Sequence, residues 1–449
     1  MMPLGDPAPQ PGGDSSERTG TPGAIARRRL MDNILSLYAL LGLYYLIPMA
    51  VLPYLVRVLG MEMYGLVAFA QSFAQYFTTL TDYGFNYSAT RSIAQQREDH
   101  NSVSKIFCSV YLIKGVLTLV GLAILALIVG LISRFRSEWL FFVAAYLAVA
   151  GNALFPMWYY QGIEKMRYIS TIVGCARILA AAMLFVFVHR PSDALLAIWI
   201  QSAGAVLSGL IGFFLAVRGF RLTLRWPSVA ELKSMVRDGW HLFLSTASIG
   251  LYTNTNVFLV GALAGNTEAG YFSAAERLLR GIQGLIVPVI QATFPHINAL
   301  RVQSREIALR FLSRSLRWIG GLTLIPSAIM FLFASRVTLL CFGQGAGGSI
   351  PVVRWIAFLP VLSAISNVLG VNTMIPFGLD RQFSRIVLVA GVVNVLLASL
   401  LIRHFGAQGG GASILVAEVI VVSGIVISLQ RNGIHLPWFR GLAEQTRTR

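Results

Sequence analysis

The chain has 449 residues, of which 56% are hydrophobic and only 12% are charged, and its formal net charge is +17. A soluble domain of this length needs more polar surface, whereas lipid replaces water around a membrane protein. The composition therefore excludes a soluble enzyme and indicates a polytopic membrane protein. The cations are scattered over short connections, which argues against a nucleic-acid surface.

The N-terminal segment, residues 1–29, begins with a stretch rich in Pro, Gly, Ser and Thr that holds no apolar run. Such a segment cannot bury enough apolar surface to fold, so we predict a disordered cytoplasmic tail. It is not a cleavable signal peptide, because the apolar segment that follows is too long and lacks a small-residue cleavage site.

The rest of the chain reads as about twelve apolar segments, each long enough to cross a bilayer as a helix. Continuous apolar runs predict helices rather than the short alternating strands of a β-barrel. The predicted fold class is an all-α membrane protein. The expected spans are 33–59, 62–82, 106–132, 139–159, 168–188, 194–217, 240–263, 271–293, 315–335, 352–374, 386–402 and 409–429.

Lys and Arg residues alternate between the two sides of the predicted membrane. Of the 36, 25 lie in the termini and every second connection, 6 lie in the other connections, and 5 lie inside spans. The positive-inside rule then places both termini and the basic connections in the cytoplasm. We therefore predict a multi-pass membrane protein with both termini in the cytoplasm.

An internal repeat divides the spans into two sixes. The glycine-bearing connections at 59–65 and 263–271 follow the first span of each half. Both halves start and end in the cytoplasm, which predicts two lobes in parallel orientation around a central cavity. The predicted organisation is a lobe at 30–217, a cytoplasmic linker at 218–238 with a short interfacial helix, a lobe at 239–430 and a cytoplasmic tail at 431–449.

Three stretches carry a resemblance to a known family. They are the segment from Leu59 to Ser72, the segment from Asp82 to Arg91, and the segment from Trp158 to Tyr168. In this order they resemble bacterial polysaccharide flippases of the O-antigen (Wzx) type. That family belongs to a superfamily that also includes MATE drug exporters and lipid II flippases.

The resemblance implies translocation of an undecaprenyl-diphosphate-linked oligosaccharide from the cytoplasmic to the periplasmic leaflet by alternating access. It also implies membrane lipids, a polysaccharide polymerase and the chain-length machinery as partners. The alternatives are a lipid II flippase, a cation-coupled small-molecule exporter, or a membrane polysaccharide polymerase or ligase. No long outer loop with catalytic residues is present, so we predict a transporter that is not an enzyme.

Intramembrane cations are costly in lipid, so each is a candidate for binding the diphosphate. The five candidates are Arg57, Lys114, Arg177, Arg277 and Arg280. Arg57 lies near a span end, where its side chain can also extend to the interface, and Lys114 can also pair structurally. In lipid II flippases, cations on the first and eighth helices face the cavity, but the first span here carries no Arg at mid-depth.

Arg277 and Arg280 are three positions apart and share a helix face, with Glu276 four before Arg280. An ion pair between Glu276 and Arg280 is expected, and two Arg against one Glu leave net positive charge. A carboxylate in lipid can carry a proton or bind sodium, so Glu418, Glu276 and Asp82 are candidates for ion coupling. Glu418 shows no obvious partner in the sequence.

Amides in the spans are candidates for binding sugar hydroxyls, namely Asn254, Asn256 and Gln75. Hydrogen bonds between helices are the alternative role for these amides. The glycine-rich runs at 343–349 and 406–411 lack the end of a phosphate-binding loop, so we predict turns there. No cofactor or metal is predicted, because the six His and three Cys show no ligand spacing.

Overall fold

A computed structural model provides the fold. It describes residues 22–219, 222–223, 225–284, 290, 293–294, 297–298, 300–301 and 303–434. No β-strand occurs among them, and the predicted all-α class is confirmed. The predicted tail lies outside the described residues over 1–21. Residues 22–29 are instead the first turns of a helix, because Pro22 stands at the first helical position, where proline is tolerated, and the Ala and Arg residues after Gly23 favour helix.

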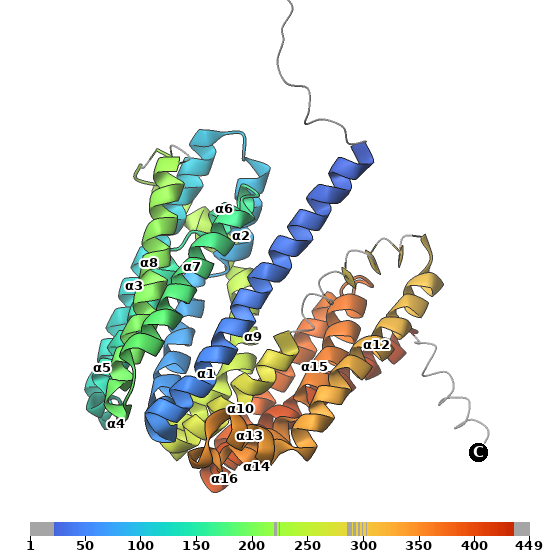
Figure 1. The fold of residues 1–449 in the computed structure, drawn as a ribbon. Coiled ribbons are helices and arrows are strands. Elements are labelled where there is room, and N and C mark those ends of the chain that lie inside the picture. Colours follow the sequence, from blue (N-terminus) through green and yellow to red (C-terminus); the bar gives the residue numbers. More distant parts are fainter. Residues whose placement is uncertain are drawn as a thin grey trace, which may run out of the picture.

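Helices of the two halves group into an N-terminal and a C-terminal lobe (Figure 1). The N-terminal lobe consists of α1 (Pro22–Asp82), α2 (Phe85–Gln95), α3 (His100–Leu131), α4 (Ser133–Ser137), α5 (Trp139–Leu154), α6 (Met157–Gly162), α7 (Met166–Phe187) and α8 (Ala194–Gly219). The C-terminal lobe consists of α9 (Val229–Ala264), α10 (Asn266–Gly284), α12 (Arg305–Leu332), α13 (Ala334–Phe342), α14 (Ser349–Ile356), α15 (Leu359–Ser366), a π-helix (Asn367–Met374) and α16 (Asp380–Arg431).

Two of these helices each contain two predicted spans. α1 breaks at Gly60, where φ is 72°, and α16 breaks at Gly406, where φ is 53°. Glycine adopts this left-handed conformation without a Cβ clash, so each break reverses the chain. Eight stretches of the described chain are long and apolar enough to span a membrane, and two of them hold these broken pairs. With α9 and α10, they account for the twelve predicted spans.

The glycine run at 406–411 differs from the predicted turn. Only Gly406 turns the chain, whereas Gly409 and Gly410 are buried within the second part of α16. A Cβ on Gly410 would lie 2.9 Å from Val260 of α9, and 3.2 Å from Phe272 of α10. These glycines therefore permit close helix packing inside the C-terminal lobe, which a sequence pattern of turns does not reveal.

The inter-lobe linker also differs in part. Ser228 and Glu231 form a capping box at the start of α9, with the Ser228 amide donating to Glu231 at 2.8 Å. The expected interfacial helix therefore begins as predicted, but it is not a short separate helix. It continues without a break to Ala264 because no proline interrupts it. The remaining domain boundaries stay predictions.

Apart from the first part of α9, which packs against α2 and α3 of the N-terminal lobe, the lobes contact each other near one end of the molecule and diverge toward the other (Figure 1). The contact end includes the turn at Gly60 and helices α4, α13 and α14. Gly65 of α1 lies against the backbone of Asn266 and Gly270 of α10, so the two helices cross with no side chain between them. The diverging end carries α2, α6 and the predicted cytoplasmic connections.

Candidate functional site

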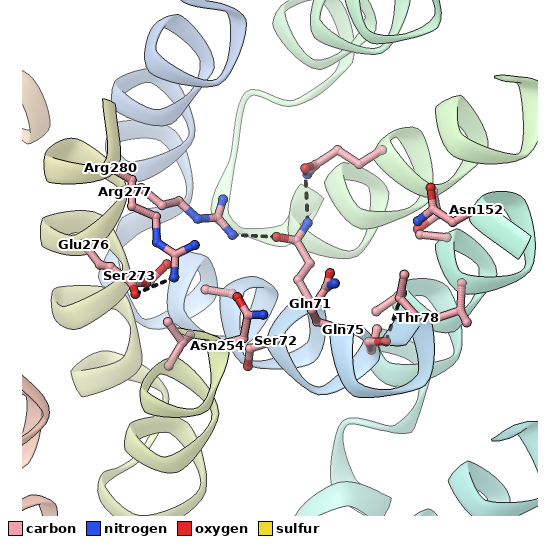
Figure 2. Close-up of a pocket in the computed structure, with 18 residues that line it drawn as sticks. Gln71, Ser72, Gln75, Thr78, Asn152, Asn254, Ser273, Glu276, Arg277 and Arg280 are labelled. Atoms are coloured by element: carbon pink, nitrogen blue, oxygen red, sulfur yellow. Dashed lines mark hydrogen bonds and ion pairs between the residues drawn. The ribbon is translucent and has the colours of Figure 1, made fainter. Parts of the chain in front are cut away.

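A cavity of about 330 Å³ lies between the lobes, lined by α1, α5 and α8 from one side and by α9 and α10 from the other. Figure 2 shows the side chains that point into it. Its lining is rich in amides, hydroxyls and charges. The polar lining residues are Gln71, Ser72, Gln75, Thr78, Asn152, Gln201, Ser202, Asn254, Ser273, Glu276, Arg277 and Arg280.

Arg277 starts a chain of hydrogen bonds that crosses the cavity (Figure 2). Its guanidinium donates to Gln71 Oε1 at 2.8 Å, and Gln71 Nε2 donates to Gln201 Oε1 at 3.1 Å. Gln201 in turn donates to the carbonyl of Ala197 at 3.0 Å. The guanidinium also lies 5.8 Å from the centre of the Tyr64 ring. A cation of the C-terminal lobe is thus held by side chains of the N-terminal lobe.

Arg280 pairs with Glu276 on the same helix, with Nη2 and Oε1 2.8 Å apart. Glu276 is nearly buried, at 6% side-chain exposure, whereas Arg280 is 43% exposed. The expected ion pair is present. Because Arg277 adds a second positive charge, the charged side chains that line the cavity sum to one net positive charge. Such a surface attracts an anionic group.

Five of the predicted site residues therefore line one cavity, namely Gln75, Asn254, Glu276, Arg277 and Arg280. Gln201 and Asn152 line it as well and were not predicted. The sequence offered a reason to predict both residues, because an amide within an apolar span is costly unless it bonds to another helix or faces water. Their position beside the cavity depends on the packing of α5 against α8.

Known proteins are similar to this chain in sequence and in fold. The sequence model of a family described as polysaccharide biosynthesis protein matches residues 30–301. A protein of Escherichia coli (strain K12) named as an O-antigen transporter is 30% identical over 403 residues, which cover 90% of this chain and 97% of that protein. This chain belongs to the polysaccharide biosynthesis protein family. The predicted resemblance is confirmed.

A further relative and two solved structures extend the comparison. A Shigella dysenteriae protein, also named as an O-antigen transporter, is 29% identical and covers 88% of this chain and 98% of its own length. An inward-facing MATE family multidrug transporter has a TM-score of 0.62 at 18% identity, covering 86% of this chain and 98% of its own. The lipid II flippase MurJ in an inward closed conformation has a TM-score of 0.62 at 12% identity, covering 86% and 87%.

At these identities the two structures establish the fold of this polysaccharide biosynthesis protein and nothing more. That fold agrees with the predicted two-lobe membrane bundle. The relatives reported are named as transporters or as a flippase and not as enzymes, which agrees with the predicted class.

Lys114 and Asp82 lie outside the cavity and pair with each other. Lys114 Nζ donates to Asp82 Oδ1 at 3.1 Å, and the Lys114 side chain is only 2% exposed. Burial of a lysine requires such a partner, because an unpaired ammonium in a low-dielectric interior is strongly disfavoured. The geometry therefore favours structural pairing over diphosphate binding as the role of Lys114.

Arg57 and Arg177 are also absent from the lining of the cavity. Arg57 donates to the carbonyl of Leu340, at the end where the lobes meet. Its guanidinium thus ties the end of the first span to α13. Arg177 is half-buried in α7 and takes part in an interaction within the described chain.

Asn256 belongs to a buried amide pair rather than to the cavity. Asn394 donates to Asn256 Oδ1 at 3.0 Å, and Asn256 donates to the carbonyl of Gly410 at 3.4 Å. These bonds join α9 to both parts of α16. Asn254, two positions earlier, lines the cavity instead, because two positions along an α-helix correspond to a rotation of about 200°, which places the two side chains on nearly opposite faces.

Glu418 has a partner, contrary to what its sequence surroundings indicated. The carboxylate accepts a hydrogen bond from Ser366 at 2.7 Å and is 5% exposed. Ser366 lies at the end of α15, which a linear reading of α16 cannot place. Glu418 thus sits inside the C-terminal lobe, whereas Glu276 faces the cavity and Asp82 lines a separate pocket.

Proposed function

We propose that this protein is a flippase that translocates an undecaprenyl-diphosphate-linked oligosaccharide, an O-antigen or exopolysaccharide repeat unit, from the cytoplasmic to the periplasmic leaflet. The observation that carries the proposal is the cavity between the lobes, where Arg277 and Arg280 stand among amides and hydroxyls. A glycan diphosphate cannot cross hydrocarbon unaided, because burying its charge and hydroxyls without partners is costly. The family and the names of its relatives support this cargo class.

The two groups of polar residues suit the two parts of the cargo. The guanidinium groups match phosphate oxygens, which they bind in a bidentate manner. The amides of Gln71, Gln75 and Asn254 supply both donors and acceptors, as sugar hydroxyls require. If a diphosphate binds Arg280 and breaks its ion pair with Glu276, the Glu276 carboxylate becomes able to bind a proton or a sodium ion. Glu276 is therefore our first candidate for ion coupling, ahead of Glu418 and Asp82.

We propose transport by alternating access of the two lobes. The arrangement in Figure 1 supports this, because the lobes meet at one end and diverge at the end with the basic connections. We assign that diverging end to the cytoplasm of a bacterial inner membrane, with both termini there. Opening on the other side requires the contacts between α1 and α10 to separate. The polymerase and chain-length machinery are the partners we propose for the released unit.

Deletion of the gene tests the proposal directly. We expect lipid-linked units to accumulate in the cytoplasmic leaflet and surface polysaccharide to be lost, with both restored by the wild-type gene on a plasmid. The measurement is leaflet-resolved analysis of lipid-linked sugars together with analysis of the surface polymer. Units that reach the periplasm but stay unpolymerised would indicate a polymerase or ligase instead. An unchanged surface polymer would indicate drug export or another lipid such as lipid II.

A further inference from the structure

A second cavity of about 330 Å³ lies in the N-terminal lobe, at the end of the molecule that carries the basic connections. It is bordered by the end of α1, by α2 and α6, and by α9 of the other lobe. The lining residues used below are Thr79, Asp82, Asn86, Tyr87, Gln161 and Thr246. Of these residues, the function proposed above names only Asp82, as a lower-ranked candidate for ion coupling.

A sharp turn builds the second cavity. Tyr83 and Gly84 both have positive φ, 44° and 74°, so the chain reverses direction between α1 and α2. The turn is braced by α9, because the Tyr83 ring stacks on Phe243 at 4.9 Å. A Cβ on Gly84 would lie 2.9 Å from the Phe243 backbone nitrogen. The reversal brings Asn86 and Tyr87 to the same side as Asp82.

The charged side chain that lines this cavity is an acid that is ion-paired with Lys114, whereas the charged side chains of the first cavity sum to one net positive charge. Asp82 is the one charged residue among its lining residues, and the carboxylate is 35% exposed. Buried Lys114 holds Oδ1, and among the described residues no hydrogen bond reaches Oδ2. A free anionic oxygen in the cavity disfavours a diphosphate but accepts hydrogen bonds from hydroxyl or ammonium groups.

The remaining groups complement that carboxylate. Gln161 lines the cavity with an amide that can both donate and accept hydrogen bonds. Asn86 adds a second amide, and Tyr87 adds an exposed aromatic ring. Vicinal hydroxyls of a sugar donate and accept at adjacent positions, and the apolar face of a sugar ring packs on an aromatic ring. A carboxylate, amides and a tyrosine meet both requirements.

A single face of α1 connects the two cavities. Gln71, Gln75, Thr78 and Asp82 are spaced by four, three and four residues, which places them in one row along the helix. The first three line the cavity between the lobes, and Asp82 lines the second one. From Gln75 to Asp82 the helix rises by about 10 Å. The two cavities therefore lie along one row of α1, and a ligand with an anionic end and a hydroxyl-rich end would have to span about 10 Å along this row to reach both.

We propose that the second cavity is a sugar-binding subsite that holds the glycan of the cargo while the diphosphate is bound at Arg277 and Arg280. The inference rests on the flippase function proposed above and deepens it, because it states which end of the lipid-linked glycan lies in which cavity. The sugars lie toward the diverging end of the lobes and the diphosphate lies deeper. In this subsite, the ion pair with Lys114 holds the Asp82 carboxylate in position as a hydrogen-bond acceptor.

Binding measurements on the purified full-length protein separate the two ends of the ligand. One probe is undecaprenyl diphosphate without sugar, and the other is the undecaprenyl-diphosphate-linked glycan purified from the membranes of the source organism. We expect the double variant Asn86→Ala/Gln161→Ala to weaken binding of the glycosylated lipid about tenfold or more, since two hydrogen bonds to the sugar are lost. Binding of undecaprenyl diphosphate should not change. Gln95→Ala, an exposed amide on α2, is the matched control and should change neither.

The remaining outcomes are distinguishable. An equal loss for both probes in the double variant would overturn the subsite, because it would indicate a general structural defect. No loss for either probe would overturn it as well, since the cavity would then hold no sugar. Tyr87→Ala supplies a second test with the same expected preference for the glycosylated probe, since this ring lines the cavity and is exposed, so that its removal leaves no buried charge without a partner. If wild-type protein bound neither probe, the flippase function itself would fail.

Discussion

Arg277 and Arg280 lie three positions apart on α10, yet their partners differ in kind. Arg280 is neutralised within its own helix by Glu276, whereas Arg277 is bound by Gln71 of the opposite lobe. A neutral amide orients a guanidinium without cancelling its charge. Arg277 is therefore the stronger candidate for attracting the diphosphate, and it is also a contact that must change when the lobes move.

Replacement of this arginine tests that assignment. We expect Arg277→Ala to reduce transport at least tenfold while the protein reaches the membrane in normal amounts, because loss of one charge-assisted hydrogen bond costs about 1.5–3 kcal/mol. The measurement is restoration of surface polysaccharide in the deletion strain, normalised to protein in the membrane. Arg310→Ala is the control, since Arg310 forms an exposed pair with Glu306 and should be dispensable. Full restoration by Arg277→Ala would remove the residue from the cargo site.

At the scale of elements, glycines decide how closely the helices approach. Gly65 of α1 lies against the backbone of Asn266 and Gly270 in α10, at the end where the lobes meet. Small residues permit such backbone contact between membrane helices, where apolar burial drives association only weakly. The close crossing of α1 and α10 in turn places Tyr64 beneath Arg277. Helix packing at this point thus helps to shape the cavity.

A methyl group at this crossing should be enough to disturb it. We expect Gly65→Ala to destabilise the protein by about 1–3 kcal/mol and to reduce transport, because the added Cβ overlaps the carbonyl of Asn266. Thermal unfolding of the purified protein in detergent measures the effect. Gly320→Ala is the matched control, since no atom lies within 4 Å of its added Cβ and alanine favours helix. Equal melting temperatures for Gly65→Ala and wild type would contradict the role of this contact.

For the whole molecule, the central question is which end of the bundle faces the cytoplasm. From the distribution of Lys and Arg we predict that the diverging end faces the cytoplasm. The Tyr76 hydroxyl of α1 donates to Thr255 Oγ1 of α9 at 3.0 Å, so the lobes also touch at the depth of the cavity. An outward-open state requires a different set of contacts.

Cysteine labelling in intact spheroplasts tests this orientation. The three native cysteines, Cys108, Cys175 and Cys341, are first replaced by serine. A membrane-impermeant thiol reagent should then label Ser192→Cys and should label Glu98→Cys only after the cells are opened. Both positions are exposed, so access to the reagent depends on the side of the membrane. The opposite labelling pattern would reverse the assigned topology and the direction of transport.

Hydropathy and charge are properties of short segments. They were sufficient to predict the all-α membrane class, the twelve spans and the cationic side chains that lie within the spans. Lipid forces each apolar run into a helix, whatever its neighbours are. The tertiary structure alone decided which polar groups meet. Glu418 meets Ser366, Lys114 meets Asp82, and Gln71 meets both Arg277 and Gln201 only because distant helices pack together. These pairings depend on helix rotation and on glycine contacts, which the periodicity of one segment does not encode.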